Sequence, residues 1–98
     1  MSAPVGFQIS DDALEWCESE VSAGHFNSFS DVVDFSLRFL LISIRNGEAP
    51  SPRHSTRTTR KTARVNGWVL DELMATGMFR KTDIADYAII HLRDSLDK

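Results

Sequence analysis

The residues most suited to chemistry are cations in the middle of the chain. Residues 45–64 hold six basic side chains and one acidic one, a net charge of +5, although the whole chain of 98 residues has a net charge of −3. Within this segment Arg60, Thr62 and Arg64 alternate with other residues, so in a strand they would share one face. Arginine can bond a partner through two parallel N–H groups. The segment is therefore either an anion-binding surface or a solvated linker.

A second pair of cations precedes an expected helix. Arg80 and Lys81 stand directly before Thr82 and Asp83, a hydroxyl and an acid of the kind that a first helical turn favours. Free backbone amides, the positive end of a helix dipole and two cations would converge there on one phosphate-sized site. We therefore predict an anion site at residues 80–82.

Other reactive residues indicate neither a metal nor catalysis. The three histidines and Cys17 match no zinc-binding spacing, so we predict no metal and no other cofactor. The carboxylates at 31, 34, 83 and 86 fit first-turn acids better than acid–base pairs, and we expect no sizeable pocket in so small a core. We therefore predict that the protein is not an enzyme.

Cysteine use and hydropathy bear on the compartment. One cysteine forms no internal disulfide, and no signal peptide is evident, so a reducing cytoplasm is the default expectation. The longest apolar stretch, 32–44, is shorter than the ~20 residues of a membrane span. We expect no membrane contact.

The elements that position the cations occur twice. The sequence GHF at 24–26, followed by SDVVDF at 30–35, matches GMF at 77–79, followed by TDIADY at 82–87. Before each glycine comes an alternating strand pattern and a short helical stripe, and after it a second helix. We therefore predict two units, 1–45 and 58–98, joined by a basic linker rich in Pro, Ser and Thr at 46–57.

The order strand, helix, helix constrains the fold. Ser28 is expected to cap a helix from Asp31 to about Ile44, which is apolar at nine of fourteen positions and should be buried on several sides. One such unit can neither pair its strand nor bury its helices. Two units would form a two-stranded antiparallel ribbon backed by four helices, a mainly α fold.

This arrangement resembles the ribbon-helix-helix family of DNA-binding proteins, the class of the Arc, MetJ and CopG repressors and of ParD-type antitoxins. The first half carries the resemblance best, in residues 9–15 (ISDDALE) and 22–33 (SAGHFNSFSDVV). The likeness covers roughly residues 5–44 and 58–96, and it implies a tandem ribbon-helix-helix pseudo-dimer.

The resemblance also implies a function. A protein of this family inserts its ribbon into the major groove of double-stranded DNA, and the amino ends of its second helices hold phosphates. We therefore expect a sequence-specific transcriptional regulator, a repressor, in the cytoplasm and associated with the nucleoid. The expected base-reading residues are Arg60, Thr62, Arg64, Gln8 and Ser10, and the expected phosphate-binding residues are Arg80, Lys81, Thr82, Ser28, Ser30 and Arg57.

The first half departs from this pattern, which leaves alternatives open. Its strand offers Gly6, Gln8 and Ser10 without a cation, and Phe29 stands at the place of Lys81. Residues 1–44 carry seven acids and one base. An antitoxin-like or scaffold protein, which binds a protein partner through this acidic half and DNA weakly or not at all, is the alternative function. The two units are expected to pair within one chain, with a homodimer or a higher assembly on DNA as the alternative.

Overall fold

The computed structural model describes residues 2–48 and 58–96. Its elements are, in order, β1 (Ser2–Ser10), α1 (Asp11–Ser22), α2 (Phe29–Arg45), β2 (Thr58–Asn66), α3 (Gly67–Ala75) and α4 (Ile84–Leu96). The chain is therefore mainly helical with one two-stranded sheet, as predicted, and the order strand, helix, helix occurs twice. Most of the predicted linker, residues 49–57, lies outside the described residues.

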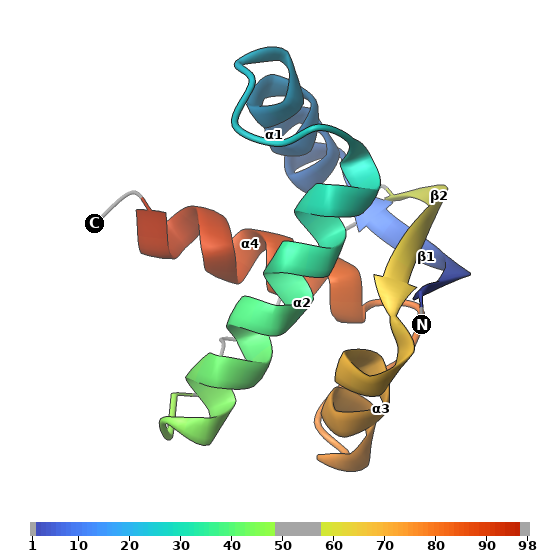
Figure 1. The fold of residues 1–98 in the computed structure, drawn as a ribbon, viewed down its shortest axis with the longest axis vertical. Coiled ribbons are helices and arrows are strands. Elements are labelled where there is room, and N and C mark those ends of the chain that lie inside the picture. The colour runs from blue at the N-terminus through green and yellow to red at the C-terminus, as the bar shows by residue number, and fades with distance from the viewer. Residues whose placement is uncertain (1, 49–57, 97–98) are drawn as a thin grey trace.

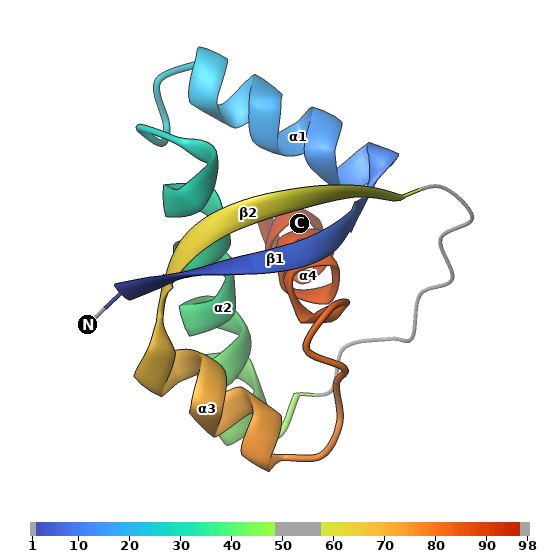
Figure 2. The same cartoon turned by 90° about the vertical axis from the view of Figure 1, so that its right-hand side faces the viewer.

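The two strands form an antiparallel ribbon along their whole length. Ser2 lies opposite Asn66 and Ser10 opposite Thr58, with Gly6 and Thr62 as the central pair. One side of this ribbon, its inner face, carries buried apolar side chains from both strands, Phe7, Ile9, Ala63 and Val65. The strands cross in front of α2 and α4, and none of the helices covers their outer face (Figure 2).

The free edge of β2 is bonded to the start of α2. The backbone N–H of Arg64 donates to Ser30 Oγ at 3.0 Å, and that of Asn66 donates to Asp34 Oδ1 at 2.9 Å. Both acceptors lie in the first two turns of α2, four residues apart. An exposed strand edge is a template for unwanted pairing, and these side chains close the end of the edge nearest α3.

The free edge of β1 is bonded in the same way to residues at the start of α4. The N–H of Gln8 donates to the carbonyl oxygen of Thr82 at 2.8 Å, and that of Ser10 donates to Asp86 Oδ1 at 3.0 Å. Thr82 and Asp86 are the repeat equivalents of the residues that hold β2. Each half of the sequence therefore holds the strand of the other half.

Helix ends agree with the sequence pattern, except at the start of α4. Ser28 caps α2 by accepting from the N–H of Asp31 at 3.2 Å, and Gly24 and Gly77 have the predicted left-handed backbone, with φ of 82° and 71°. However, α4 begins only at Ile84, because the N–H groups of residues 83 and 84 both donate to the carbonyl oxygen of Arg80 and form a separate turn.

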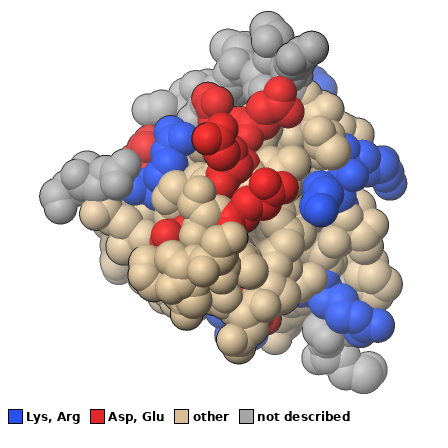
Figure 3. Space-filling model, turned by 90° about the horizontal axis from the view of Figure 1, so that it is seen from above, with Lys and Arg blue, Asp and Glu red and all other residues tan. Residues whose placement is uncertain are grey.

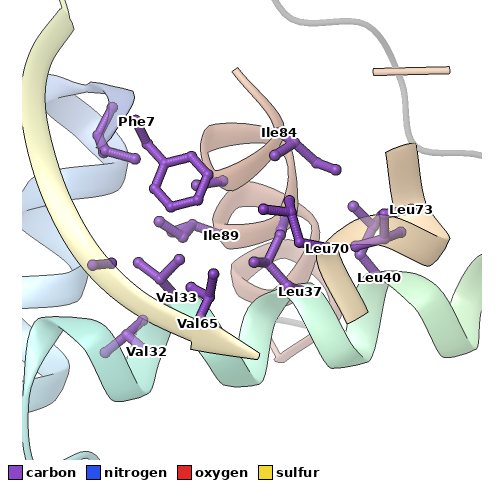
Figure 4. Close-up of a cluster of buried hydrophobic side chains, with 14 of the residues drawn as sticks. Phe7, Val32, Val33, Leu37, Leu40, Val65, Leu70, Leu73, Ile84 and Ile89 are labelled. Carbon is purple, nitrogen blue, oxygen red and sulfur yellow. The ribbon is translucent and has the colours of Figure 1, made fainter. Parts of the chain in front are cut away.

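The core lies where α2 and α4 cross behind the ribbon, and α1 and α3 lie at opposite ends of it (Figure 1, Figure 2). Side chains from β1, β2, α2, α3 and α4 meet there, including Phe7, Leu37 and Ile89 (Figure 4). The prediction that α2 is buried on several sides holds only in part, since Phe35 and Ile42 are 49% and 56% exposed.

Cys17 of α1 belongs to this core. Its side chain is fully buried, and burial, with Glu18 and Asp86 adding repulsion, raises the pKa of the thiol from 9.0 to about 12. The thiol is therefore protonated at neutral pH and unsuited to act as a nucleophile.

In the part of the chain that the structure describes, no helix has the length and apolarity to cross a bilayer.

Pairing of the two strands within one chain predicts how heat denatures the protein. A ribbon built from two chains is stabilised by mass action, so its melting temperature rises with protein concentration. Here both strands belong to one chain, and we expect the same melting temperature across a hundred-fold range of concentration, measured by circular dichroism. A melting temperature that rises with concentration would contradict pairing within the chain.

Candidate nucleic-acid interface

The outer face of the ribbon is polar and cationic at β2. Arg60, Thr62 and Arg64 are all exposed, as the alternation of the strand predicted. Within residues 2–48 and 58–96, neither arginine forms an ion pair with an acid. Their donors are therefore available to a partner that approaches the ribbon from outside.

Arg60 lies across the centre of the ribbon. A Cβ added to Gly6 would stand 2.7 Å from one terminal nitrogen of Arg60, so glycine allows the guanidinium to lie close to the backbone of β1. The guanidinium is the far end of a flexible side chain, and it can swing outward when a partner binds. Gly6 thus makes room for a cation from the opposite strand.

β1 contributes less to this face than predicted. Gln8 lies opposite Arg60 and is partly exposed, and its Oε1 accepts from the hydroxyl of Thr58 at 2.9 Å, which orients the amide. The prediction that Ser10 presents its side chain on the outer face is wrong. Ser10 is only 3% exposed, because its Oγ donates to Asp86 Oδ1 at 2.6 Å and accepts from the N–H of Ala13 at 3.3 Å as the cap of α1.

At one flank of the ribbon, the start of α2 borders a surface hollow of about 460 Å³. Ser28 and Ser30, predicted to bind phosphate, line this hollow together with Arg64, predicted to read a base. Both hydroxyls already accept structural hydrogen bonds, from residues 31 and 64, and Asp31 and Asp34 also line the hollow. Arg38 lines the hollow too, but it pairs with Asp34 at 3.0 Å, so Arg64 is the cation best placed to bring positive charge to this flank.

At the other flank, Arg80, Lys81 and Thr82 are exposed in the turn before α4. In the described chain neither cation is paired with an acid. The carbonyl oxygen of Thr82 is bonded to β1, which anchors the turn beside the ribbon. Because α4 begins at Ile84, the free amides of its first turn lie further along the chain than predicted. Arg57, the remaining predicted contact, lies outside the described residues.

Comparison with other proteins adds no identification. No family model matches the sequence, and no curated protein or solved structure is significantly similar to it. The chemistry of this surface must therefore be argued from its own residues.

Negative charge is gathered on a different face. The exposed acids of α1 are Asp11, Asp12, Glu15 and Glu18. Seen from the side of α1, acidic side chains occupy the middle of the surface, and cationic ones lie on the right, the side of the ribbon in Figure 1, and in a further group on the left (Figure 3). The modest net charge of −3 thus conceals an acidic helix and a cationic ribbon.

Sequence reasoning missed Lys61 and the surface hollows. Lys61 lies on the inner face of the ribbon, with its Nζ 5.3 Å from the centre of the Phe29 ring. The signal was present in the alternation, which places a charge on the side of Ala63 and Val65.

Hollows of about 280 to 460 Å³ occur, although we expected no sizeable pocket. No group of three or more His, Cys, Asp and Glu among the described residues could hold a metal ion.

Proposed function

We propose that the chain is a tandem ribbon-helix-helix protein that binds double-stranded DNA in a sequence-specific manner and regulates transcription on the nucleoid, as a repressor. The observation that carries this proposal is the uncovered outer face of the ribbon, where Arg60 and Arg64, on either side of Thr62, form no ion pair with any described acid. The major groove, about 12 Å wide, admits a two-stranded ribbon. No described helix stands in the way of such an approach.

The proposed tandem arrangement is supported by the bonds at the two strand edges. Ser30 and Asp34 hold β2, whereas Thr82 and Asp86 hold β1, and the two pairs occupy equivalent places in the repeat. A two-fold relation between the halves would pass through the central pair of the ribbon, Gly6 and Thr62. Such reciprocal bonding is what two pairing units require.

The side chains of the interface suit different parts of DNA. Arg60 and Arg64 can each bond the two acceptors of a guanine edge, Gln8 can bond adenine, and Thr62 between the arginines suits either a base edge or a thymine methyl. Arg80 and Lys81 stand beside the ribbon, where the phosphate backbone would pass. We therefore assign base recognition to the ribbon and phosphate binding to the turn before α4.

The salt dependence of binding tests this function. We expect a mixed-sequence duplex of about 30 base pairs to bind more weakly as salt rises, with a slope of about −0.9 in log K per neutralised phosphate. Replacing Arg80 and Lys81 by glutamine should make the slope shallower by about 2, since each phosphate contact contributes about one. Fluorescence anisotropy at several salt concentrations measures both.

A matched control removes two other cations. Arg45→Gln with Arg93→Gln changes the net charge equally, at the ends of α2 and α4 that point away from the ribbon (Figure 1). The slope of this control should equal that of the natural chain. No binding by the natural chain at low salt would overturn the proposed function, and an unchanged slope in the Arg80 and Lys81 variant would overturn their assignment.

The acidic face of α1 supports a second candidate, a protein-interaction module. Asp12, Glu15 and Trp16 line a hollow of about 280 Å³ together with Arg93 of α4. Such a face suits a basic protein partner through charge complementarity. This candidate would be favoured by a stoichiometric partner that co-purifies with the chain, is released by Glu15→Lys, and leaves no detectable DNA affinity at low salt.

A further inference from the structure

Lys61 is a charged residue in an apolar position. Across the ribbon it lies opposite Phe7, which is fully buried, and Ala63 and Val65 on the same side of β2 are buried too. Lys61 itself is partly buried, and in the described chain it forms no ion pair with an acid. A fully buried lysine is almost always paired, whereas a partly buried one buries its stem and keeps its ammonium in water. Within the described residues Lys61 is thus a cation without an acidic partner.

A cavity of about 350 Å³ opens beside Lys61, between α1 and the start of α2. Leu14, Cys17 and Val21 of α1 and Phe29 of α2 form its apolar walls. Its polar groups are Lys61, Glu18 and Ser22. Small-molecule sites run from about 300 to 1,000 Å³ and combine apolar walls with a few polar groups, so this cavity is at the small end of that range.

The position of the ammonium is set by an aromatic ring. Lys61 Nζ lies 5.3 Å from the centre of the Phe29 ring, a cation–π contact that holds the charge over one wall of the cavity. An aromatic face attracts the cation without neutralising it. The ammonium therefore stays available to an anion that enters beside the ring.

We propose that this cavity binds a small monocarboxylate with an apolar body. Its carboxylate would bond the ammonium of Lys61, and its hydrocarbon would pack against Leu14, Val21 and Phe29. A charge-assisted bond and apolar burial then act on the two ends of one molecule.

The surrounding charge argues for a single negative charge on the ligand. Glu18 lines the same cavity. Its carboxylate repels dianions and the phosphate backbone of DNA more strongly than it repels a monoanion. The cavity contains no residue of the outer ribbon face, so this proposal does not depend on the proposed function.

Phenylacetate is a suitable probe, because phenylacetamide has nearly the same shape without the charge. We expect phenylacetate to shift the methyl NMR signals of Leu14 and Val21 in a saturable manner when it is added to the full chain without DNA. Phenylacetamide should bind about ten- to a hundred-fold more weakly, the ratio typical of one charge-assisted hydrogen bond. The dianion benzylphosphonate should also bind more weakly than phenylacetate.

Two variants separate the charge of Lys61 from general effects. Lys61→Met keeps the apolar stem, and it should reduce the preference for phenylacetate over phenylacetamide to about one. Arg45→Met is the matched control, since Arg45 also lies over an aromatic ring, that of Trp68 at 5.7 Å, far from the cavity; its preference should equal that of the natural chain.

Three outcomes would overturn the proposal. The first is the absence of saturable shifts in the natural chain, and the second is equal affinity of the natural chain for phenylacetate and its amide. The third is an unchanged preference in the Lys61→Met variant. The first two comparisons need no variant, so they hold even where Lys61→Met alters folding.

Discussion

Replacing Arg60 and Arg64 together by alanine is expected to lower the affinity for a preferred DNA site by about a thousand-fold. A bidentate contact between arginine and guanine is worth about 1–3 kcal/mol, or roughly five- to 150-fold for each residue. Both side chains are exposed and unpaired within the described chain, so their loss should change the free energy of unfolding by no more than about 0.5 kcal/mol. Binding to duplexes enriched from a random library, by anisotropy at fixed salt, measures the loss.

The control for this prediction keeps the change in net charge and moves it away from the ribbon. Arg45→Ala with Arg93→Ala removes two arginines from the far ends of α2 and α4, and it should change the affinity less than about three-fold by weakening the general attraction of the chain for DNA. Equal losses in the two double variants would mean that the ribbon arginines contribute charge alone. An unchanged affinity in the Arg60 and Arg64 variant would show that the outer face of the ribbon does not bind DNA.

Replacing Asp86 by alanine is expected to destabilise the fold by about 3–5 kcal/mol. The carboxylate is 7% exposed and accepts two hydrogen bonds from Ser10, from its N–H at 3.0 Å and its hydroxyl at 2.6 Å. Hydrogen bonds to charged groups contribute about 1.5–3 kcal/mol each, and the buried donors would be left without their acceptor. Small domains have only about 5–15 kcal/mol of stability in total. Urea denaturation followed by tryptophan fluorescence measures the change.

Two further substitutions serve as comparisons for the loss of stability in Asp86→Ala. Asp86→Asn keeps the shape and one good acceptor, so a smaller loss of about 1–2 kcal/mol is expected. Asp34 is the repeat equivalent of Asp86, but it is only partly buried and also pairs with Arg38 at 3.0 Å. Water can replace its hydrogen bonds, and Asp34→Ala should cost about 1 kcal/mol. Similar losses for Asp34→Ala and Asp86→Ala would refute the role given to burial.

The fold was predictable where local patterns and the repeat agree. Alternation in 5–9 and 60–66, the glycines at 24 and 77, and the cap at Ser28 are local signals, and each has the predicted backbone in the structure. The bond between the carbonyl oxygen of Thr82, in the turn before α4, and the N–H of Gln8 in β1 was not predictable, because the two residues lie far apart in the sequence. Long-range bonds of this kind leave no periodic signature.

The candidate site was predictable at the exposed cations and not at its polar neighbours. Arg60, Thr62 and Arg64 are exposed because strand alternation decides their side. Ser10 shares their side of the ribbon, yet the turn into α1 and the carboxylate of Asp86 bury it. Lys61 was missed because the alternation of β2 places it on the core side of the strand. The cavity beside it is formed by residues of α1 and α2, which the pattern of the strand does not include.

Pairing of two unlike strands has one more consequence under the proposed function. A ribbon made from two copies of one strand presents the same side chains to both half-sites, and its operators are palindromic. Here β1 offers Gln8, while β2 offers Arg60, Thr62 and Arg64. The two ends of the groove would meet different chemistry, so the protein would have a direction on DNA. Its operator would then be a non-palindromic sequence that orients the acidic helix α1 toward one side of the site.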